Sequence, residues 1–284
     1  MCNTSQYNKS YIAMKPLHLR QKSIAQPVWV VLCVLGLNPS AALAQETQPG
    51  SKGPQNTTKL GLGLSLNDEG HKGLGVKTTL LPALQIQTPR FSLRGTSAEL
   101  MVTDPTNQDF SVNLRVDALL QGYKSSDAPI FAGMATRKPS VLLGVGAKFM
   151  TPVGQLWLEV GNDVTGNSKG LRTEIGLGWK IDSSSGLGKW SLTPYISAQS
   201  NSAKLANYYY GVAASEAAAG RPAYDAGSTT NFNLGVSAAT DLTPSLSLVL
   251  GARYRGFGSG IRQSPLMDSA GGLSGSASLL YRLY

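Results

Sequence analysis

Few residues in this sequence combine a type and a spacing that could perform chemistry. His71 is the one histidine beyond residue 44, so a Ser-His-Asp triad would have to use it. Nothing around residues 67–73 has the pattern of a nucleophile elbow, and we interpret His71 as a hairpin-loop residue without a catalytic role. One histidine and no cysteine in that part of the chain are too few ligands for zinc, and the spacing of Asp68 and Glu69 is not that of an EF-hand. We therefore expect neither an enzyme nor a metal or other cofactor.

Charged residues that alternate with apolar ones are the other candidates for a functional role. In the segment 171–181 the odd positions are apolar apart from Thr173, whereas the even positions carry charges or glycine. Segments 110–120 and 246–256 repeat this alternation. Because successive side chains of a strand point to opposite faces of the sheet, each segment predicts a strand with one apolar and one polar face. The charged residues on the polar faces are Arg115, Asp117, Lys148, Glu159, Arg172, Glu174, Lys180, Arg253 and Arg255.

Weaker alternation predicts strands over most of the remaining chain. The additional segments are 60–66, 75–87, 89–103, 141–149, 153–164, 190–198, 232–238 and 273–283. With the three segments above, the count is eleven. Bacterial membrane barrels have an even number of strands, which favours twelve and allows ten. Either one strand is missing from the count or one is split in two, and the doubt lies between Tyr123 and Pro139, where no clean strand is visible.

Two all-β architectures explain such alternation. In a soluble sandwich the apolar faces meet in a dry core, whereas in a transmembrane barrel they face lipid and the polar faces line the lumen. Each apolar face here has five or six positions, one at every second residue. The strands are therefore close in length to the roughly 9–11 residues with which a strand crosses a membrane at a tilt. Charges of both signs and many glycines on the polar faces suit a crowded, wet lumen. We therefore predict a closed antiparallel transmembrane β-barrel, because an open sheet edge in hydrocarbon leaves backbone groups unsatisfied.

Aromatic residues near the predicted strand ends support the membrane assignment. Membrane barrels carry girdles of aromatic side chains where the wall meets the two interfaces. The residues that we place in these girdles are Trp157, Trp179, Trp190, Tyr254 and Tyr281. The chain also ends within a predicted strand, on the aromatic residue Tyr284.

The first 44 residues have the order of parts of a secretory signal peptide. Positive charges between Lys15 and Lys22 precede an apolar run over 28–37, and Ala-Leu-Ala at 42–44 forms a small-residue cleavage site. The run is shorter than the roughly 20 residues that a transmembrane helix needs. We therefore expect a signal peptide over 1–44 with an alternative start at Met14, a flexible lead-in over 45–57 and the barrel over 58–284.

The charge balance favours an anionic surface over nucleic acid as the partner. The formal net charge is +9, and four basic residues with no acidic ones lie in the first 44, which leaves +5 (9 − 4) on the remainder. The lysines and arginines are spread singly rather than gathered in a basic patch. For an exported chain, we expect contact with anionic lipid, including lipopolysaccharide.

A long insertion over 203–227 separates two strand patterns. It contains three consecutive tyrosines, an alanine-rich stretch and a Gly-Arg-Pro turn, which predict an ordered loop with one helical turn over 214–219. Long loops with aromatic side chains are frequent binding surfaces. The candidate surface residues are Tyr208, Tyr209, Tyr210, Arg221, Tyr224 and Asp225. The alternative is that the three tyrosines pack the loop against the barrel rim.

Short motifs in the last third of the chain resemble those of one family of outer-membrane proteins. The motifs are Asn-Tyr-Tyr-Tyr-Gly-Val at 207–212, Gly-Arg-Pro-Ala-Tyr-Asp-Ala-Gly at 220–227, Asn-Leu-Gly-Val at 233–236, Asp-Leu-Thr-Pro at 241–244, Gly-Ala-Arg-Tyr at 251–254 and Ser-Pro-Leu at 264–266. In this order the sequence resembles the MipA/OmpV family, the MltA-interacting proteins, specifically over 205–284 and more weakly from Leu60. Members usually end in Tyr-Arg-Phe, whereas this chain ends in Tyr-Arg-Leu-Tyr at 281–284.

The resemblance implies a monomeric barrel in the outer membrane of a Gram-negative bacterium. It also implies a scaffold that joins a lytic transglycosylase to a penicillin-binding protein during peptidoglycan growth. Because other members are porin-like or adhesive, two alternatives stay open. One is a narrow channel for small solutes along the charged lumen, unless the charges pair across the lumen and close it. The other is a surface adhesin that binds through 203–227 or 67–73.

Overall fold

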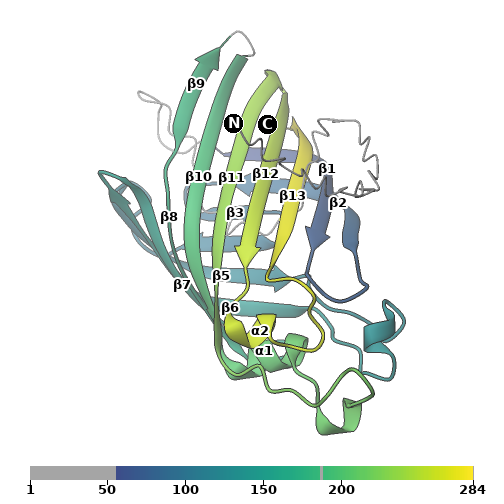
Figure 1. The fold of residues 1–284 in the computed structure, drawn as a ribbon. Coiled ribbons are helices and arrows are strands. Elements are labelled where there is room, and N and C mark those ends of the chain that lie inside the picture. The colour runs from purple at the N-terminus through teal and green to yellow at the C-terminus, as the bar shows by residue number, and fades with distance from the viewer. Residues whose placement is uncertain (1–55, 186–187, 284) are drawn as a thin grey trace, which may run out of the picture. The chain divides into compact units, whose positions relative to one another are not determined.

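The computed structural model describes residues 56–185 and 188–283, which form a closed antiparallel β-barrel (Figure 1). The strands are β1 (Thr57–Asp68), β2 (Val76–Gln87), β3 (Phe91–Arg94), β4 (Ser97–Met101), β5 (Phe110–Leu119), β6 (Ser140–Thr151), β7 (Gly154–Asp163), β8 (Leu171–Gly178), β9 (Ile181–Ser185), β10 (Gly188–Asn201), β11 (Thr229–Thr243), β12 (Leu246–Gly256) and β13 (Gly271–Arg282). The helices are η1 (Pro129–Phe131), α1 (Ala203–Tyr210), η2 (Ala214–Glu216) and α2 (Ser259–Arg262). The predicted signal peptide, the lead-in up to residue 55 and Tyr284 lie outside the described residues.

Twelve strands build the wall, which confirms the number favoured over ten from the count of eleven and the even-number rule. Consecutive strands pair with one another, and β1 pairs with β13 to close the ring. β8 and β9 both pair with β10, each along a different part of it, so the predicted strand over 171–181 is interrupted at Trp179 and Lys180. The 13 strands therefore amount to twelve (13 − 1) around the wall.

The polarity of the wall is inverted relative to a soluble protein. On β8, Ile175 is 48% exposed, whereas the neighbouring Glu174 is 6% exposed. The same alternation holds on β1, where Leu60 and Leu62 are exposed and Lys59 is buried. Apolar side chains thus cover the outside of the closed cylinder and charged ones project into it, which is the arrangement of a transmembrane barrel.

The twelfth strand does not come from residues 123–139, where the doubt lay. It comes from the segment 89–103, which forms the hairpin of β3 and β4 instead of one strand. Gly95 stands at the hairpin turn with a φ of 55°, a left-handed conformation that glycine adopts without strain. Residues 120–139 form a long connection that contains η1.

The two ends of the barrel differ in the length of their connections. β1 begins and β13 ends on one side, where the turns 88–90, 152–153 and 244–245 are short. The opposite end carries the long connections, with α1 and α2 (Figure 1). In barrels of the outer membrane, short turns face the periplasm and long loops face outward, and we name the two ends accordingly. No helix among residues 56–185 and 188–283 has the length and apolar character to cross a membrane.

Aromatic side chains of the outward face lie near both ends of the wall. Trp179 and Tyr281 are exposed near the periplasmic end and Tyr254 near the extracellular end. The girdle prediction is wrong for Trp157, which is fully buried. Its position in β7 has the inward orientation, and its indole lies against Gly176, the directly opposite residue on β8, where a Cβ atom would collide with the ring.

The inverted polarity predicts which face of β8 tolerates charge. We expect Ile175→Arg to destabilise the folded barrel by about 2–4 kcal/mol, because it places a cation against hydrocarbon. Val164→Arg is the matched control, since Val164 is 58% exposed, against 48% for Ile175, but lies in the extracellular turn after β7. The measurement is urea unfolding in lipid vesicles, followed by heat-modifiable migration. Equal losses for the two variants would contradict a lipid-facing Ile175.

Candidate functional site

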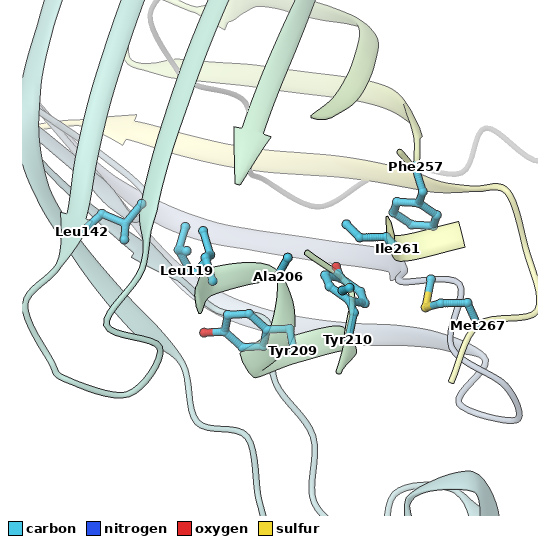
Figure 2. Packing of buried hydrophobic residues seen from close by; sticks show 10 residues of the cluster. Leu119, Leu142, Ala206, Tyr209, Tyr210, Phe257, Ile261 and Met267 are labelled. Carbon is cyan, nitrogen blue, oxygen red and sulfur yellow. The ribbon is translucent and has the colours of Figure 1, made fainter. Parts of the chain in front are cut away.

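The long extracellular connections fold over the mouth of the barrel as a packed layer. We call residues 69–75, 120–139, 202–228 and 257–270 the cap. Its central cluster joins Leu119 and Leu142 of the wall to Ala206, Tyr210 and Ile261 of the cap (Figure 2). A second buried cluster includes Tyr123, Phe131, Val212 and Leu266. Because four connections share these two clusters, the cap is one layer rather than a set of separate loops.

Helix α1 anchors the cap to the wall. Ser202 caps its first turn, since the hydroxyl accepts a hydrogen bond from the Leu205 amide at 3.5 Å and another from the Leu171 amide of β8 at 2.9 Å. Its buried residues, Leu205, Ala206, Tyr209 and Tyr210, share one face at helical spacing. The prediction for this insertion missed the helix and expected a turn over 214–219, where the structure has η2 (Ala214–Glu216). Ser202, followed by apolar residues at helical spacing, is the sequence signal from which this helix could have been predicted.

The structure places five of the six residues predicted as a loop surface at least partly inside the cap. Tyr209, Tyr210 and Arg221 are buried, Tyr208 and Tyr224 are half-buried, and Asp225 is exposed. The Arg221 guanidinium donates to the carbonyl oxygens of Glu216, at 3.0 Å from Nε, and of Ala132, at 2.9 Å from Nη1. The Asp225 carboxylate accepts a hydrogen bond from the side-chain amide nitrogen (Nδ2) of Asn207 at 2.6 Å. These side chains therefore connect parts of the cap to one another.

Glu216 joins the insertion to the connection 120–139. Its carboxylate accepts hydrogen bonds from Arg137 Nη2 at 2.6 Å and from the Ala135 amide at 2.9 Å. Burial alone would raise the pKa of Glu216, but these hydrogen bonds outweigh it and hold the pKa below its ordinary value. The carboxylate therefore stays ionised and paired at neutral pH.

His71 lies at the centre of the cap, although the sequence indicated a loop residue without a role. The imidazole stacks on Tyr210 at 5.4 Å between ring centroids and meets the rings of Tyr123 and Phe131 edge-on at 5.5 and 5.3 Å. It is 5% exposed. Burial lowers the pKa of His71 to about 4, so the ring is neutral at pH 7. His71 thus packs as an aromatic core residue of the cap.

Ion pairs fill one side of the lumen below the cap. Arg115 of β5 bonds to Asp117 at 2.8 Å and Glu99 of β4 at 3.1 Å, and it also pairs with Glu159 of β7. Lys148 of β6 bonds to Glu99 at 2.5 Å. Four of the predicted lumen charges therefore meet in one network. The prediction missed Glu99 because it treated 89–103 as a single strand and did not assign its faces.

A cavity of about 1150 Å³ occupies the rest of the lumen. It extends from Tyr210 and Phe257 under the cap to Lys189 and Trp190 near the periplasmic end. Four arginines and four lysines line it, against four carboxylates. The arginines are Arg94, Arg172, Arg253 and Arg255, and the carboxylates are Asp68, Glu69, Asp182 and Asp241. The cavity therefore has an excess of positive charge.

The predicted lumen charges fall into two groups by their surroundings. Arg172, Lys180, Arg253 and Arg255 line the cavity, whereas the Arg115 network fills the side formed by β4 to β7. Glu174 is buried and accepts a hydrogen bond from Gln199 at 3.0 Å. Paired charges thus fill part of the lumen and leave a charged cavity in the remainder. Within the described ranges, no three residues of the His, Cys, Asp and Glu types gather as a metal site.

Comparison with known proteins places these features in one family. Residues 60–283 match the family model described as MltA-interacting protein MipA. Outer membrane protein OmpV of Vibrio cholerae serotype O1 is 32% identical over 148 residues, which are 52% of this chain and 56% of that protein. Outer membrane protein Omp26La of Vibrio anguillarum is 30% identical over the same lengths, so the chain spans little more than half of either relative. The MltA-interacting protein of Escherichia coli K12 is 22% identical over 225 residues, 79% of this chain and 89% of that protein.

The buried imidazole predicts that acid loosens the cap. The unfolded chain binds a proton at the ordinary histidine pKa of 6.5, whereas the folded cap resists protonation until about pH 4. The contribution of His71 is therefore complete above pH 6.5 and is lost as the pH falls toward 4, by up to about 3 kcal/mol. We expect hydrogen exchange over 202–228, corrected for the intrinsic rate, to accelerate in this window.

The control for this prediction is His71→Phe, which keeps an aromatic ring among those of Tyr123, Phe131 and Tyr210 but cannot titrate. Glu69 lies 3.8 Å from His71 Nδ1, and burial raises its pKa, so its own titration stabilises the folded state as the pH falls. The difference between wild type and variant cancels this effect. An unchanged pH dependence in His71→Phe would assign the loosening to another group.

Proposed function

This chain belongs to the MltA-interacting protein MipA family, and we propose that it is a non-enzymatic scaffold of the outer membrane for peptidoglycan-remodelling enzymes. The partners would be a lytic transglycosylase and a penicillin-binding protein. The observation that carries the proposal is the family match, which covers the whole described barrel from residue 60. The name MltA-interacting protein, printed for the relative from Escherichia coli, supports the same partner class. A monomeric barrel in contact with lipopolysaccharide is part of this proposal.

The periplasmic end offers an edge on which such partners could dock. β9 pairs with β10 along one edge and, among the described strands, has no partner along the other. Ile181 and Asp182 are exposed on it. A free strand edge presents backbone donors and acceptors that can extend a sheet with a segment from another protein. The β9 edge therefore supports docking from the periplasmic side.

A pull-down tests the scaffold and the edge separately. We expect the folded full chain in detergent micelles to retain a lytic transglycosylase and a penicillin-binding protein. Ser184→Pro on β9 should weaken retention by about fivefold, the effect of about one lost backbone hydrogen bond, because the alternation of the ladder turns the amide of residue 184 away from β10. The matched control is Ser259→Pro, because proline is tolerated in the first turn of α2 at the extracellular end. Heat-modifiable migration verifies that both variants fold.

The two possible failures of this experiment have different meanings. If folded wild-type protein retains neither enzyme, the scaffold proposal is wrong. If Ser184→Pro retains both enzymes as well as wild type does, the scaffold stands and the β9 edge is excluded as its docking surface.

The cavity favours a narrow channel as a second candidate function. Eight basic residues against four carboxylates line it, so a conducting path would select anions. Planar-bilayer recording of the purified chain should then show small conductances with anion preference, reduced in Arg253→Gln. Silence over a wide voltage range, with folded protein inserted, would remove this candidate.

A further inference from the structure

The barrel wall is incomplete between β2 and β5. β3 has four residues and β4 has five, whereas β2 has 12. β3 pairs only with residues 85–87 of β2, so residues 76–83 have no ladder partner on that side among the described strands. The hairpin turn reaches the level of Leu84 and Ala118, through hydrogen bonds of 3.4 Å at Gly95 and 2.9 Å at Thr96. Above this turn, the wall lacks the width of two strands, about 10 Å.

The cap limits this gap on its extracellular side. The β1–β2 connection passes close to η1, where an added Cβ at Gly73 would contact Pro129 at 3.7 Å. Leu74 packs against the cluster that contains Tyr123 and Phe131. The gap is therefore a window in the wall. We call it the lateral opening, bounded by residues 76–84, the turn at Gly95 and Thr96, residues 119–121 and the cap.

The lumen cavity extends into the lateral opening. A closed wall contributes every second residue to its lumen, and β12 and β13 follow this rule, whereas β1, β10 and β11 each contribute a run of three consecutive residues (63–65, 189–191 and 239–241). β2 contributes a longer run, residues 81–85. Pro82 and Leu84 stand on the lipid-facing side, opposite the outward leucines of β1, and still line the cavity. Leu120, exposed beyond the end of β5, lines it from the other side. The cavity thus continues around the edge of β2 toward lipid.

An arginine cluster faces the same cavity at the level of the opening. Arg172, Arg253 and Arg255 interact electrostatically with one another, and the nearby carboxylates are Glu174, Asp117 and Glu69. The hydrogen bonds of Arg253 to Ser274 Oγ at 3.4 Å and of Arg255 to Asn233 Oδ1 at 3.3 Å use neutral acceptors. Over the whole cavity lining, eight basic residues face four carboxylates, an excess of positive charge that an anionic group would balance.

We infer that the lumen binds a single-chain amphiphile with an anionic head group, whose alkyl chain leaves the barrel through the lateral opening. The head group would lie against Arg172, Arg253 and Arg255. The chain would pass between Leu84 and Leu120 into the outer leaflet, since the opening lies in the extracellular half of the wall. This inference rests on the wall and the cavity, and it does not depend on the scaffold proposal.

The test uses dodecyl phosphate as the probe and the full chain in nanodiscs of zwitterionic lipid. Isothermal titration calorimetry should show one site for dodecyl phosphate, with at least about tenfold weaker binding of inorganic phosphate and of dodecyl maltoside. Arg255→Gln should weaken binding by about tenfold, because it removes a charge-assisted hydrogen bond. Its control is Lys204→Gln, the same loss of charge on an exposed residue of α1.

A second pair of variants tests the lateral route. Pro82→Trp fills the lateral opening, whereas Leu62→Trp adds an indole to the directly opposite, lipid-facing residue of β1, which does not line the cavity. We expect Pro82→Trp to weaken dodecyl phosphate binding by about tenfold and Leu62→Trp to leave it unchanged. Heat-modifiable migration verifies the folding of each variant.

Three outcomes would overturn the inference. Equal binding by Pro82→Trp and Leu62→Trp excludes the lateral route. Equal affinity for dodecyl phosphate and inorganic phosphate shows that the alkyl chain makes no contact. A dimer in the nanodisc that Pro82→Trp dissociates assigns the opening to a second copy of the chain.

Discussion

The pairing of β1 with β13 is the interaction on which the rest of the structure depends. In hydrocarbon, each backbone amide and carbonyl group without a partner costs several kcal/mol, so a membrane-spanning sheet must close on itself. The ladder from Lys59 and Arg282 to Asn67 and Ser274 provides this closure between the two ends of the fold. Once the ring is closed, lipid contacts its outer face and the apolar residues must be there. The polar residues must then face the lumen.

A crowded lumen explains how so many ionisable groups lie inside one small domain. A buried charge is tolerable only when it is paired and hydrogen-bonded, and the Arg115 network meets this condition with partners from three other strands. Elsewhere the lumen holds a cavity that four arginines line. The cap then covers the extracellular mouth with aromatic side chains, with the neutral ring of His71 among them. Ion pairs, the cavity and the aromatic cap thus each accommodate ionisable groups in a different part of the lumen.

The sequence predicted the fold better than the sites, for a physical reason. Strict alternation with a period of two is visible wherever one face meets lipid and the other meets charged groups, and the strand 246–256 was located to the residue. The single strand expected over 89–103 was wrong because a four-residue strand and a five-residue strand are too short to show alternation. His71 and Trp157 were misjudged because their burial depends on residues far away in sequence, such as Tyr210 and Gly176. Such contacts leave no local signal.

β2 shows how a departure from alternation carries information of its own. Residues 80–84 read Leu-Leu-Pro-Ala-Leu, apolar on both faces, where a wall strand between two neighbours should alternate. Proline cannot donate to a ladder and is confined to edges, first positions and bulges. Pro82 therefore indicates an edge within the wall, and the structure has one there, since β3 stops at the level of residue 85. An edge within a membrane wall conflicts with the closure that β1 and β13 provide. Such an edge is tolerable where the adjoining lumen supplies water or a ligand to the unpaired backbone groups. The loss of alternation in residues 80–84 and the cavity behind them therefore both follow from this edge.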